Sequence, residues 1–157
     1  FVRPGQVQGE TSPAARAIAA ALARRLAAQG GAALIFDYGH DRPGTGDTLQ
    51  AVSRHRYASP WQDPGGRDLT AHVDFAALAE AAAAAGARVH GPVGQGQWLE
   101  RMGIALRAAA LARAAPERTE EIEAARRRLT APGQMGRLFR TMALVAPDWP
   151  APTGFPK

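Results

Sequence analysis

Gly31-Ala32-Ala33-Leu34-Ile35-Phe36-Asp37-Tyr38-Gly39-His40 is the stretch that decides the fold. Residues 32–36 are apolar at every position rather than at alternate ones, which is typical of a strand covered on both faces in a parallel α/β sheet. The apolar run then stops at an acid, a phenol, a glycine and an imidazole. Because ligands bind beyond the carboxyl ends of such strands, the sequence predicts a central strand over 32–37 and a functional site at its end.

The composition fits one globular domain. The chain has 157 residues, of which 46% are hydrophobic and 21% charged, so it can bury one sizeable core. It contains no cysteine, which excludes disulfides, thiolate zinc sites and cysteine nucleophiles. No apolar run approaches about 18 residues, so we expect no transmembrane helix. The chain begins at Phe1 rather than Met and shows no signal peptide, so we expect an upstream portion to have been cut away.

The net charge of +5 is a feature that nucleic-acid-binding proteins share. However, the arginines are spread over several predicted helices and are interleaved with acids. The densest cluster, at 126–128, follows four glutamates on one predicted helix, a pattern typical of a solvated helix face. The aromatic content of 6% is also low for stacking on bases. We therefore rank nucleic-acid binding below the other functions.

A helix precedes the central strand. Ser12 and Pro13 predict its start, with Ser as N-cap and Pro in the first turn. Ile18, Leu22 and Leu26 follow at a spacing of four residues and predict its buried face. Glycines at 30 and 31 end the helix and lead directly into the strand. A helix joined to a buried strand by a short glycine loop is half of a βαβ unit.

Residues 41–68 form the least regular part of the chain, punctuated by proline and glycine. Short strands over 48–52 and 55–57 either pair with each other or lie in an ordered loop. The segment also carries Tyr57, Trp61 and several arginines, so its composition differs from that of a flexible linker. We interpret it as an ordered lid or substrate loop.

The remaining residues continue the α/β alternation. Asp74 is a suitable N-cap for a helix over 75–85. A strand over 88–93 follows, and Pro92 confines it to a sheet edge or a short span. Further helices are predicted over 95–102, 104–114 and 117–129, then a strand over 137–145 that is apolar on both faces. The tail from Pro147 onward is predicted to lie as an irregular strap over the surface.

Four sequence blocks, in this order and spacing, resemble a known family. They are Asp37-Tyr38-Gly39-His40, Asp47-Thr48-Leu49-Gln50, Asp68-Leu69-Thr70-Ala71-His72-Val73-Asp74-Phe75 and Met135-Gly136-Arg137-Leu138-Phe139. One block alone would be weak evidence. Together they resemble the carboxyl-terminal half of the S-adenosylmethionine-dependent methyltransferases related to the mitochondrial complex I assembly factor that methylates arginine, the MidA-like family. The resemblance runs from about residue 9 to residue 145.

The resemblance implies an α/β fold, the carboxyl-terminal part of a class I (Rossmann-like) methyltransferase sheet, with 1–157 as a single partial domain. In that scheme 32–37 is the fifth strand, 88–93 the sixth and 137–145 the antiparallel seventh. Residues from about 95 to 131 form a helical insertion. The resemblance also implies transfer of a methyl group from S-adenosylmethionine to an arginine of a protein, a subunit of the respiratory complex I type.

This sequence departs from the family's pattern at the cofactor site. That site is a glycine-rich loop after the first strand with an acid after the second, and we find neither. Gly94-Gln95-Gly96, an altered form of the family's Thr-Gln-Gly block, is only a G-x-G and is weak evidence for a cofactor loop. S-adenosylmethionine is therefore the cofactor expected for the intact protein, whereas this chain alone is expected to bind it weakly or not at all and to be inactive.

The end of the central strand holds the candidate catalytic residues, Asp37 and His40. Arginine methylation needs a carboxylate that holds the guanidinium by bidentate hydrogen bonds, which Asp37 can supply, and His40 can accept a proton. Tyr38 and Gly39 are assigned to substrate binding. The alternative is a structural turn, in which Asp37 caps nearby amides and Tyr38 packs on the core.

Other candidates for substrate binding follow along the chain. Thr70, His72 and Asp74 alternate, so an extended backbone would place them on one side. No metal-ligand spacing accompanies them, and we favour Asp74 as a helix cap and His72 as a residue that pins the long loop against the site. The set is completed by Thr48, Gln50 and His55 in the loop and by Gln95 at a helix start. Each of these can instead satisfy local backbone groups.

Two function classes follow from these observations. In the first, the chain is part of the methyltransferase, with a protein substrate and with the missing amino-terminal half or a second copy as partner. In the second, it is a non-catalytic α/β interaction module that completes its small sheet with a partner, because such a sheet leaves an edge open. No membrane or metal is expected. By resemblance, we expect the intact protein in the bacterial cytoplasm.

Overall fold

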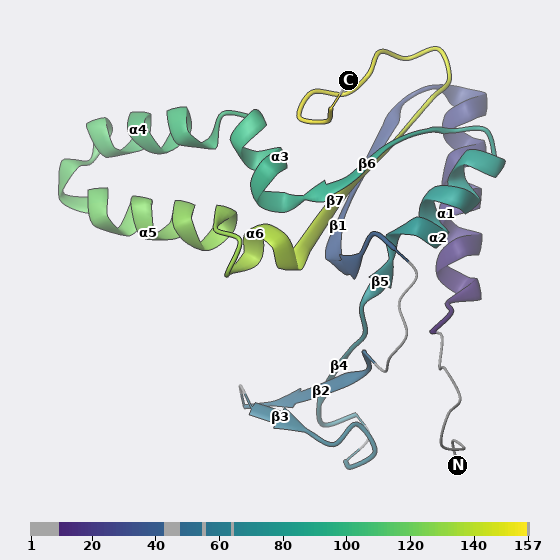
Figure 1. Cartoon of the computed structure of the whole chain (residues 1–157), viewed down its shortest axis with the longest axis horizontal. Helices are drawn as coiled ribbons and strands as arrows, with labels where there is room; N and C mark the ends of the chain where they lie inside the picture. Colours follow the sequence, from purple (N-terminus) through teal and green to yellow (C-terminus); the bar gives the residue numbers. More distant parts are fainter. Residues whose placement is uncertain (1–9, 43–47, 55, 64, 157) are drawn as a thin grey trace.

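The structure is a computed structural model that describes residues 10–42, 48–54, 56–63 and 65–156. Its main sheet has the strand order β5-β1-β7-β6 (Figure 1). The strands are β1 (Ala32–His40), β5 (Val73–Asp74), β6 (Arg88–Gly94) and β7 (Phe139–Val145). β1 pairs in parallel with β5, whereas β7 runs antiparallel to both β1 and β6. A mixed sheet interleaved with helices confirms the predicted α/β class.

Helices α1 (Pro13–Gln29) and α2 (Phe75–Ala84) pack on one face of this sheet. α1 begins as predicted, with Ser12 Oγ accepting the backbone N–H of Ala15 at 3.3 Å. Its predicted buried face was wrong in part, because Ile18 is 69% exposed. Ala19 and Ala23 are buried instead, since these small side chains let α1 approach α2 closely.

The opposite face of β1 is only partly covered. Its side chains alternate, with Ala33 and Ile35 packed on the helix core while Leu34 and Phe36 are 49% and 42% exposed. The ring of Trp98, on α3 (Gln95–Arg101), meets Phe36 edge-on at 5.1 Å. The prediction of a strand covered on both faces is therefore wrong for the described residues, because the cover on this side extends over only part of the strand.

The carboxyl-terminal tail covers another part of that face, over β7 and β6. It is irregular, as predicted, and the Arg88 guanidinium holds it by donating to the carbonyls of Pro147 and Trp149. Phe155 is 8% exposed and packs with Ala143 and Val145. The tail therefore supplies a second, smaller apolar cluster beneath the sheet.

β1 extends three residues beyond its predicted end at Asp37. β7 pairs with it through Tyr38, and β5 pairs with Gly39 and His40. Among the described residues, β5 is the strand on that edge of β1 and reaches no further, so the edge of residues 32–38 carries no strand. There the Asp37 Oδ1 accepts the backbone N–H of Tyr38 at 2.8 Å.

The other two predicted strands also differ in detail. β6 is an edge strand, as Pro92 predicted, and its register shifts between His90 and Val93. The last strand begins at Phe139 rather than at residue 137, because α6 (Met135–Leu138) precedes it. A Cβ on Gly136 would overlap the Thr130 carbonyl, so glycine lets this short helix pack tightly on the preceding segment.

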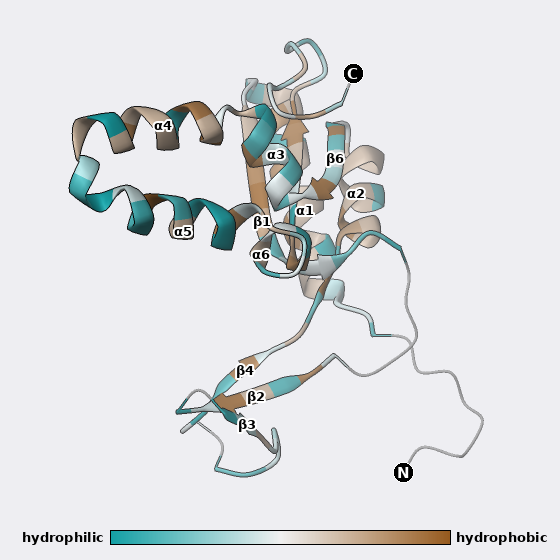
Figure 2. Cartoon of the chain, turned by 60° about the vertical axis from the view of Figure 1, so that its left-hand side comes forward, coloured by the Kyte–Doolittle hydropathy of each residue, from teal (hydrophilic) through white to brown (hydrophobic). Residues whose placement is uncertain are grey.

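A second sheet of three short strands lies apart from the main sheet (Figures 1 and 2). It has the order β3-β2-β4 and consists of β2 (Gln50–Ser53), β3 (Arg56–Ala58) and β4 (Asp68–Thr70). Both pairings are antiparallel. The irregular segment of the sequence thus forms paired strands rather than only an ordered loop. We call this unit the small sheet.

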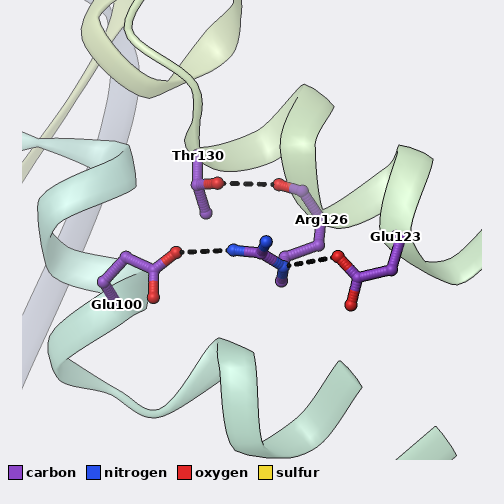
Figure 3. Close-up of polar contacts among 4 residues, drawn as sticks. All are labelled: Glu100, Glu123, Arg126 and Thr130. Atoms are coloured by element: carbon purple, nitrogen blue, oxygen red, sulfur yellow. Dashed lines mark hydrogen bonds and ion pairs between the residues drawn. The ribbon is translucent and has the colours of Figure 1, made fainter. Parts of the chain in front are cut away.

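The helices of the predicted insertion form an arm that projects from the main sheet (Figure 1). It contains α4 (Ile104–Ala114), the short helix η1 (Pro116–Arg118) and α5 (Thr119–Thr130). Arg126 on α5 donates to Glu123 at 3.0 Å and to Glu100 on α3 at 3.1 Å (Figure 3). The hydrogen bond and charge of Glu123 raise the pKa of Arg126. These contacts tie the arm to the end of α3.

Candidate functional site

A cavity of about 660 Å³ lies between the carboxyl end of β1 and the small sheet. Its walls come from both units. The main body contributes Tyr38 and Leu138, the small sheet contributes Gln50, Val52, Arg56, Tyr57 and Thr70, and the linker to β5 contributes Ala71 and His72. We call it the substrate cavity. Four residues that the sequence assigned to substrate binding, Tyr38, Gln50, Thr70 and His72, are brought together here.

Tyr38 is positioned by the strand pairing. It lies opposite Phe139 in the β1–β7 register, and their rings are 4.3 Å apart. Successive residues of a strand point to opposite faces, so Tyr38 and Asp37 do not share a face. This explains why Tyr38 lines the substrate cavity while Asp37 does not.

A second cavity, of about 450 Å³, lies on the other side of the same linker. Its lining joins the start of α1, the end of β1 and the start of α2. Its polar residues are Glu10, Thr11, Ser12, Arg16, His40, His72 and Asp74. Because Ala71 and His72 line both cavities, the linker between β4 and β5 forms their common wall.

A chain of hydrogen bonds ties this linker to the start of α1. The backbone N–H of His72 donates to Thr48 Oγ1 at 2.9 Å, and Thr48 donates through its backbone N–H to Glu10 at 2.7 Å. The Thr48 hydroxyl also donates to Glu10. The interaction expected to pin the loop is therefore made by the backbone of His72 rather than by its imidazole, and it involves Glu10, which the sequence did not indicate.

The two candidate catalytic residues are placed differently. Asp37 uses one carboxylate oxygen to accept the N–H of Tyr38, as the structural alternative predicted. It lies directly opposite Arg140, whose guanidinium is 3.8 Å from Asp41. His40 lines the second cavity, and its Nδ1 is buried without a hydrogen-bond partner among the described residues. The structure does not place Asp37 and His40 in one cavity, and their catalytic roles stay predictions.

Gly39 and Asp74 have evident structural roles. A Cβ on Gly39 would overlap the Val73 carbonyl and lie 2.8 Å from the Phe75 ring, so only glycine lets β5 and α2 approach β1. Asp74 Oδ1 accepts the backbone N–H of Ala77 at 3.0 Å, which confirms the predicted helix cap. Asp74 also lines the second cavity, so a role in binding stays a prediction.

Gln95 lies away from both cavities. It is 8% exposed, and its Nε2 donates to the Leu129 carbonyl at 3.0 Å, which joins α3 to the end of α5. The glycines beside it serve packing. A Cβ on Gly94 would lie 2.9 Å from the Gly136 carbonyl, and one on Gly96 would overlap the Thr130 carbonyl. The two glycines of the G-x-G pattern therefore let the backbone of neighbouring segments pack closely against them. These residues do not fit a cofactor loop.

Some expectations lie outside the described residues. His55 and Asp47 belong to this group, so nothing is added to their predicted roles. Among the residues that the structure describes, no group of three His, Cys, Asp or Glu side chains could hold a metal ion. No helix in the described ranges is long and apolar enough to cross a membrane. Arg56, Tyr57 and Leu138 are cavity residues that the sequence had not assigned, because their approach to Tyr38 depends on tertiary packing.

The fold is consistent with a Rossmann-like methyltransferase, and comparisons with known proteins show the family. Residues 3–93 match the model of the family described as "Putative S-adenosyl-L-methionine-dependent methyltransferase". The chain belongs to this family.

The chain is similar in sequence to curated proteins that are named arginine methyltransferases. The chain is 44% identical over 126 residues to the protein arginine methyltransferase NDUFAF7 homologue of Drosophila melanogaster, and 38% identical over 138 residues to the NDUFAF7 arginine methyltransferase of Rattus norvegicus. These alignments cover 78% and 87% of this chain but only 28% and 31% of the relatives. The chain thus spans about a third of their length or less.

Two crystal structures of Burkholderia thailandensis proteins have similar folds. One has a TM-score of 0.80 at 30% identity, and the alignment covers 90% of this chain and 39% of that one. The other, bound to S-adenosyl-homocysteine, has a TM-score of 0.79 at 31% identity, with 90% and 38% covered. S-adenosylmethionine is thus the methyl donor of the family, and its demethylated product occupies one neighbour.

Proposed function

We propose that this chain is the carboxyl-terminal part of an S-adenosylmethionine-dependent protein arginine methyltransferase, in which the substrate cavity receives the methyl-accepting protein. One observation carries the proposal. Tyr38, Gln50, Thr70 and His72, each assigned to substrate binding from the sequence, line one cavity at the carboxyl end of β1. That position is where α/β sheets bind their ligands.

The cofactor-binding site is formed largely by residues outside this chain. The glycine pattern at 94–96 is filled by backbone packing, and the chain spans 28–31% of the arginine methyltransferase relatives. S-adenosylmethionine supplies the methyl group. Calorimetric titration of the 157-residue chain with S-adenosylmethionine tests this division of the site. We expect no measurable binding, and micromolar affinity would show that the described residues suffice.

Recognition of an arginine needs a carboxylate, because a carboxylate can hold the planar guanidinium by two parallel hydrogen bonds. Asp37 is the proposed ligand. Its Oδ2 makes no hydrogen bond with the described residues, and its Oδ1 accepts only the N–H of Tyr38. His40, with its unpartnered Nδ1, is the proposed proton acceptor. The acceptor protein is proposed to be a subunit of the respiratory complex I type, methylated in the cytoplasm of a bacterial cell.

The function is tested with the full-length protein, radiolabelled S-adenosylmethionine and protein extract from the same cells depleted of small molecules. Acid hydrolysis of the labelled protein separates methylated arginine from methylated lysine. We expect the label in methylarginine. Label confined to lysine or to small molecules would overturn the proposed substrate class.

The open edge of β1 favours a second candidate, a non-catalytic module that completes its sheet with a partner. Among the described residues, no strand pairs with one edge of residues 32–38, and Leu34 and Phe36 beside it are exposed. Light scattering after size-exclusion chromatography tests self-association of the chain. A dimer that dissociates when Phe36 is replaced by Asp supports this candidate, whereas a stable monomer opposes sheet completion by a second copy.

A further inference from the structure

The small sheet and the turns beside it carry three arginines that form no salt bridge within the described part of the chain. Arg54, Arg56 and Arg67 make no ion pair or hydrogen bond with another described residue. On the arm, by contrast, Arg118 is paired with Glu121, and Arg126 is held by two glutamates (Figure 3). The described charged side chains of residues 50–70 are these three arginines and two carboxylates, Asp63 and Asp68, so this part of the chain has a small excess of positive charge.

The positions of these arginines indicate a binding role. Arg56 lines the substrate cavity, whereas Arg54 and Arg67 line, together with Asp68, a smaller cavity of about 410 Å³ at the turn end of β2. The Nε of Arg67 is buried without a partner among the described residues. Arg54 has a φ of 48°, a conformation that glycine or asparagine adopts at lower cost. Turn geometry therefore does not explain an arginine at this position.

The lining of the substrate cavity has a clear charge preference. It contains Arg56, and none of its lining residues is Asp or Glu. The carboxylates of the small sheet, Asp63 and Asp68, do not line this cavity, and a Cβ on Gly66 would overlap the carboxylate of Asp63, which lies over that turn. A cavity with an unpaired guanidinium and no carboxylate suits an anionic group, not the guanidinium of a substrate arginine.

The small sheet also offers features suited to an extended peptide. β3 and β4 each pair only with β2 among the described strands, so each leaves one backbone edge for a further strand. Tyr57 and Trp61 are 83% and 80% exposed, and Tyr57 reaches the cavity. Large exposed aromatics beside arginines are enriched at protein interfaces.

We propose that the small sheet docks an acidic segment of the protein substrate, with Arg56 binding an Asp or Glu that flanks the methylated arginine. This inference rests on the proposed function for the presence of a protein substrate. It adds that the segment of the substrate flanking the methylated arginine is acidic. The target arginine is held near the end of β1, while the flanking carboxylate enters the substrate cavity beside Gln50 and Thr70.

The test measures binding without methyl transfer. Two fluorescein-labelled 15-residue peptides, identical except for Asp and Glu flanks in one and Asn and Gln flanks in the other, surround a single arginine. They are titrated into the full-length protein at low and high salt. We expect the acidic peptide to bind roughly ten-fold more tightly at low salt, with the advantage shrinking as salt rises.

Variants assign the effect to the small sheet. Arg56→Glu is expected to abolish the preference for the acidic peptide. Arg113→Glu reverses the charge of an exposed α4 residue that lines neither cavity, and it is expected to leave the preference unchanged. Thermal unfolding of both variants checks that they fold, and Arg56→Gln supplies a milder second variant. Equal affinities of the two peptides, or equal losses in Arg56→Glu and Arg113→Glu, would overturn the proposal.

Two further outcomes separate this inference from its alternatives. Tighter binding of a uridine oligonucleotide than of the acidic peptide would overturn it in favour of nucleic acid. Arginine methylation is measured separately on the same preparations. Methylation without a preference for acidic flanks overturns the docking inference alone. A preference without methylation overturns the proposed function and leaves the docking surface for acidic segments.

Discussion

Gly39 controls the approach of three elements at the site. Its missing side chain admits the Val73 carbonyl and the Phe75 ring against β1. A backbone carbonyl cannot move aside without breaking the β1–β5 pairing, so Gly39→Ala is expected to destabilise the fold by about 1–3 kcal/mol. Gly133→Ala is the matched control, because nothing lies within 4 Å of a Cβ there. Urea unfolding of the two variants measures the difference, and equal stabilities would contradict the packing described.

His90 is expected to make the fold less stable in acid. Burial lowers its pKa, and the nearby Arg88 lowers it further. Its Nε2 is also buried without a partner among the described residues. Because the folded state disfavours the protonated imidazole, the stability is present above the unfolded pKa of about 6.5 and is lost as the pH falls through the folded pKa. His90→Gln is therefore expected to lose less stability than the wild type between pH 7.5 and pH 5. Identical pH profiles would contradict this account.

Substitutions of Asp74 distinguish its role as the cap of helix α2 from a chemical role in the second cavity. Its carboxylate caps α2, so Asp74→Ala is expected to cost roughly 0.5–2 kcal/mol of stability. Asp74→Ser keeps a capping oxygen and is expected to retain most of that stability. If methyl transfer also survives in the Ser variant, capping is the whole role of Asp74. If activity falls while stability is kept, the residue contributes to the second cavity.

The arm depends on a small number of polar contacts. α5 has no buried residue, and Arg126 links it to both Glu123 and Glu100. Arg126→Ala is expected to speed amide hydrogen exchange in residues 119–130. Arg127→Ala, at the exposed neighbouring position, is expected to leave exchange close to that of the wild type. Similar exchange in both variants would show that the glutamate contacts do not hold the arm.

Sequence patterns predicted the elements better than their ends or their neighbours. The helices at 13–29 and 75–84 have strong local signals, because Ser12 and Asp74 cap them and glycines follow them closely. The end of β1 was misplaced because Tyr38, Gly39 and His40 join the strand through pairing with distant residues. The cover over the two faces of β1 was also overestimated, because apolar composition does not reveal which face a neighbouring segment will cover.

The residues of the candidate site were also predicted only in part. Tyr38, Gln50, Thr70 and His72 were identified from motifs and lie around one cavity. Glu10 and Arg56 were not, because Glu10 meets Thr48 across 38 residues and Arg56 meets the cavity only once the small sheet is folded. Gln95 shows the opposite limit, since a motif residue at a helix start lies in a structural contact.

The whole molecule consists, in its described part, of two units joined by a linker. The small sheet faces the end of β1 across the substrate cavity, and the bonds from Glu10 through Thr48 to His72 secure the linker beside it. This arrangement places the proposed substrate-docking surface next to the strand end that carries the proposed chemistry. The substrate and the cofactor would then reach the site through different parts of the protein.

The kinetics of a Thr70→Ala variant of the full-length protein test whether the substrate cavity binds the protein substrate. Thr70 is exposed and lines the substrate cavity, so its loss is not expected to disturb the fold. We predict that the KM for the protein substrate rises about 2- to 10-fold, as expected for one lost hydrogen bond, while the KM for S-adenosylmethionine is unchanged. An unchanged KM for the protein substrate would contradict the assignment of this cavity.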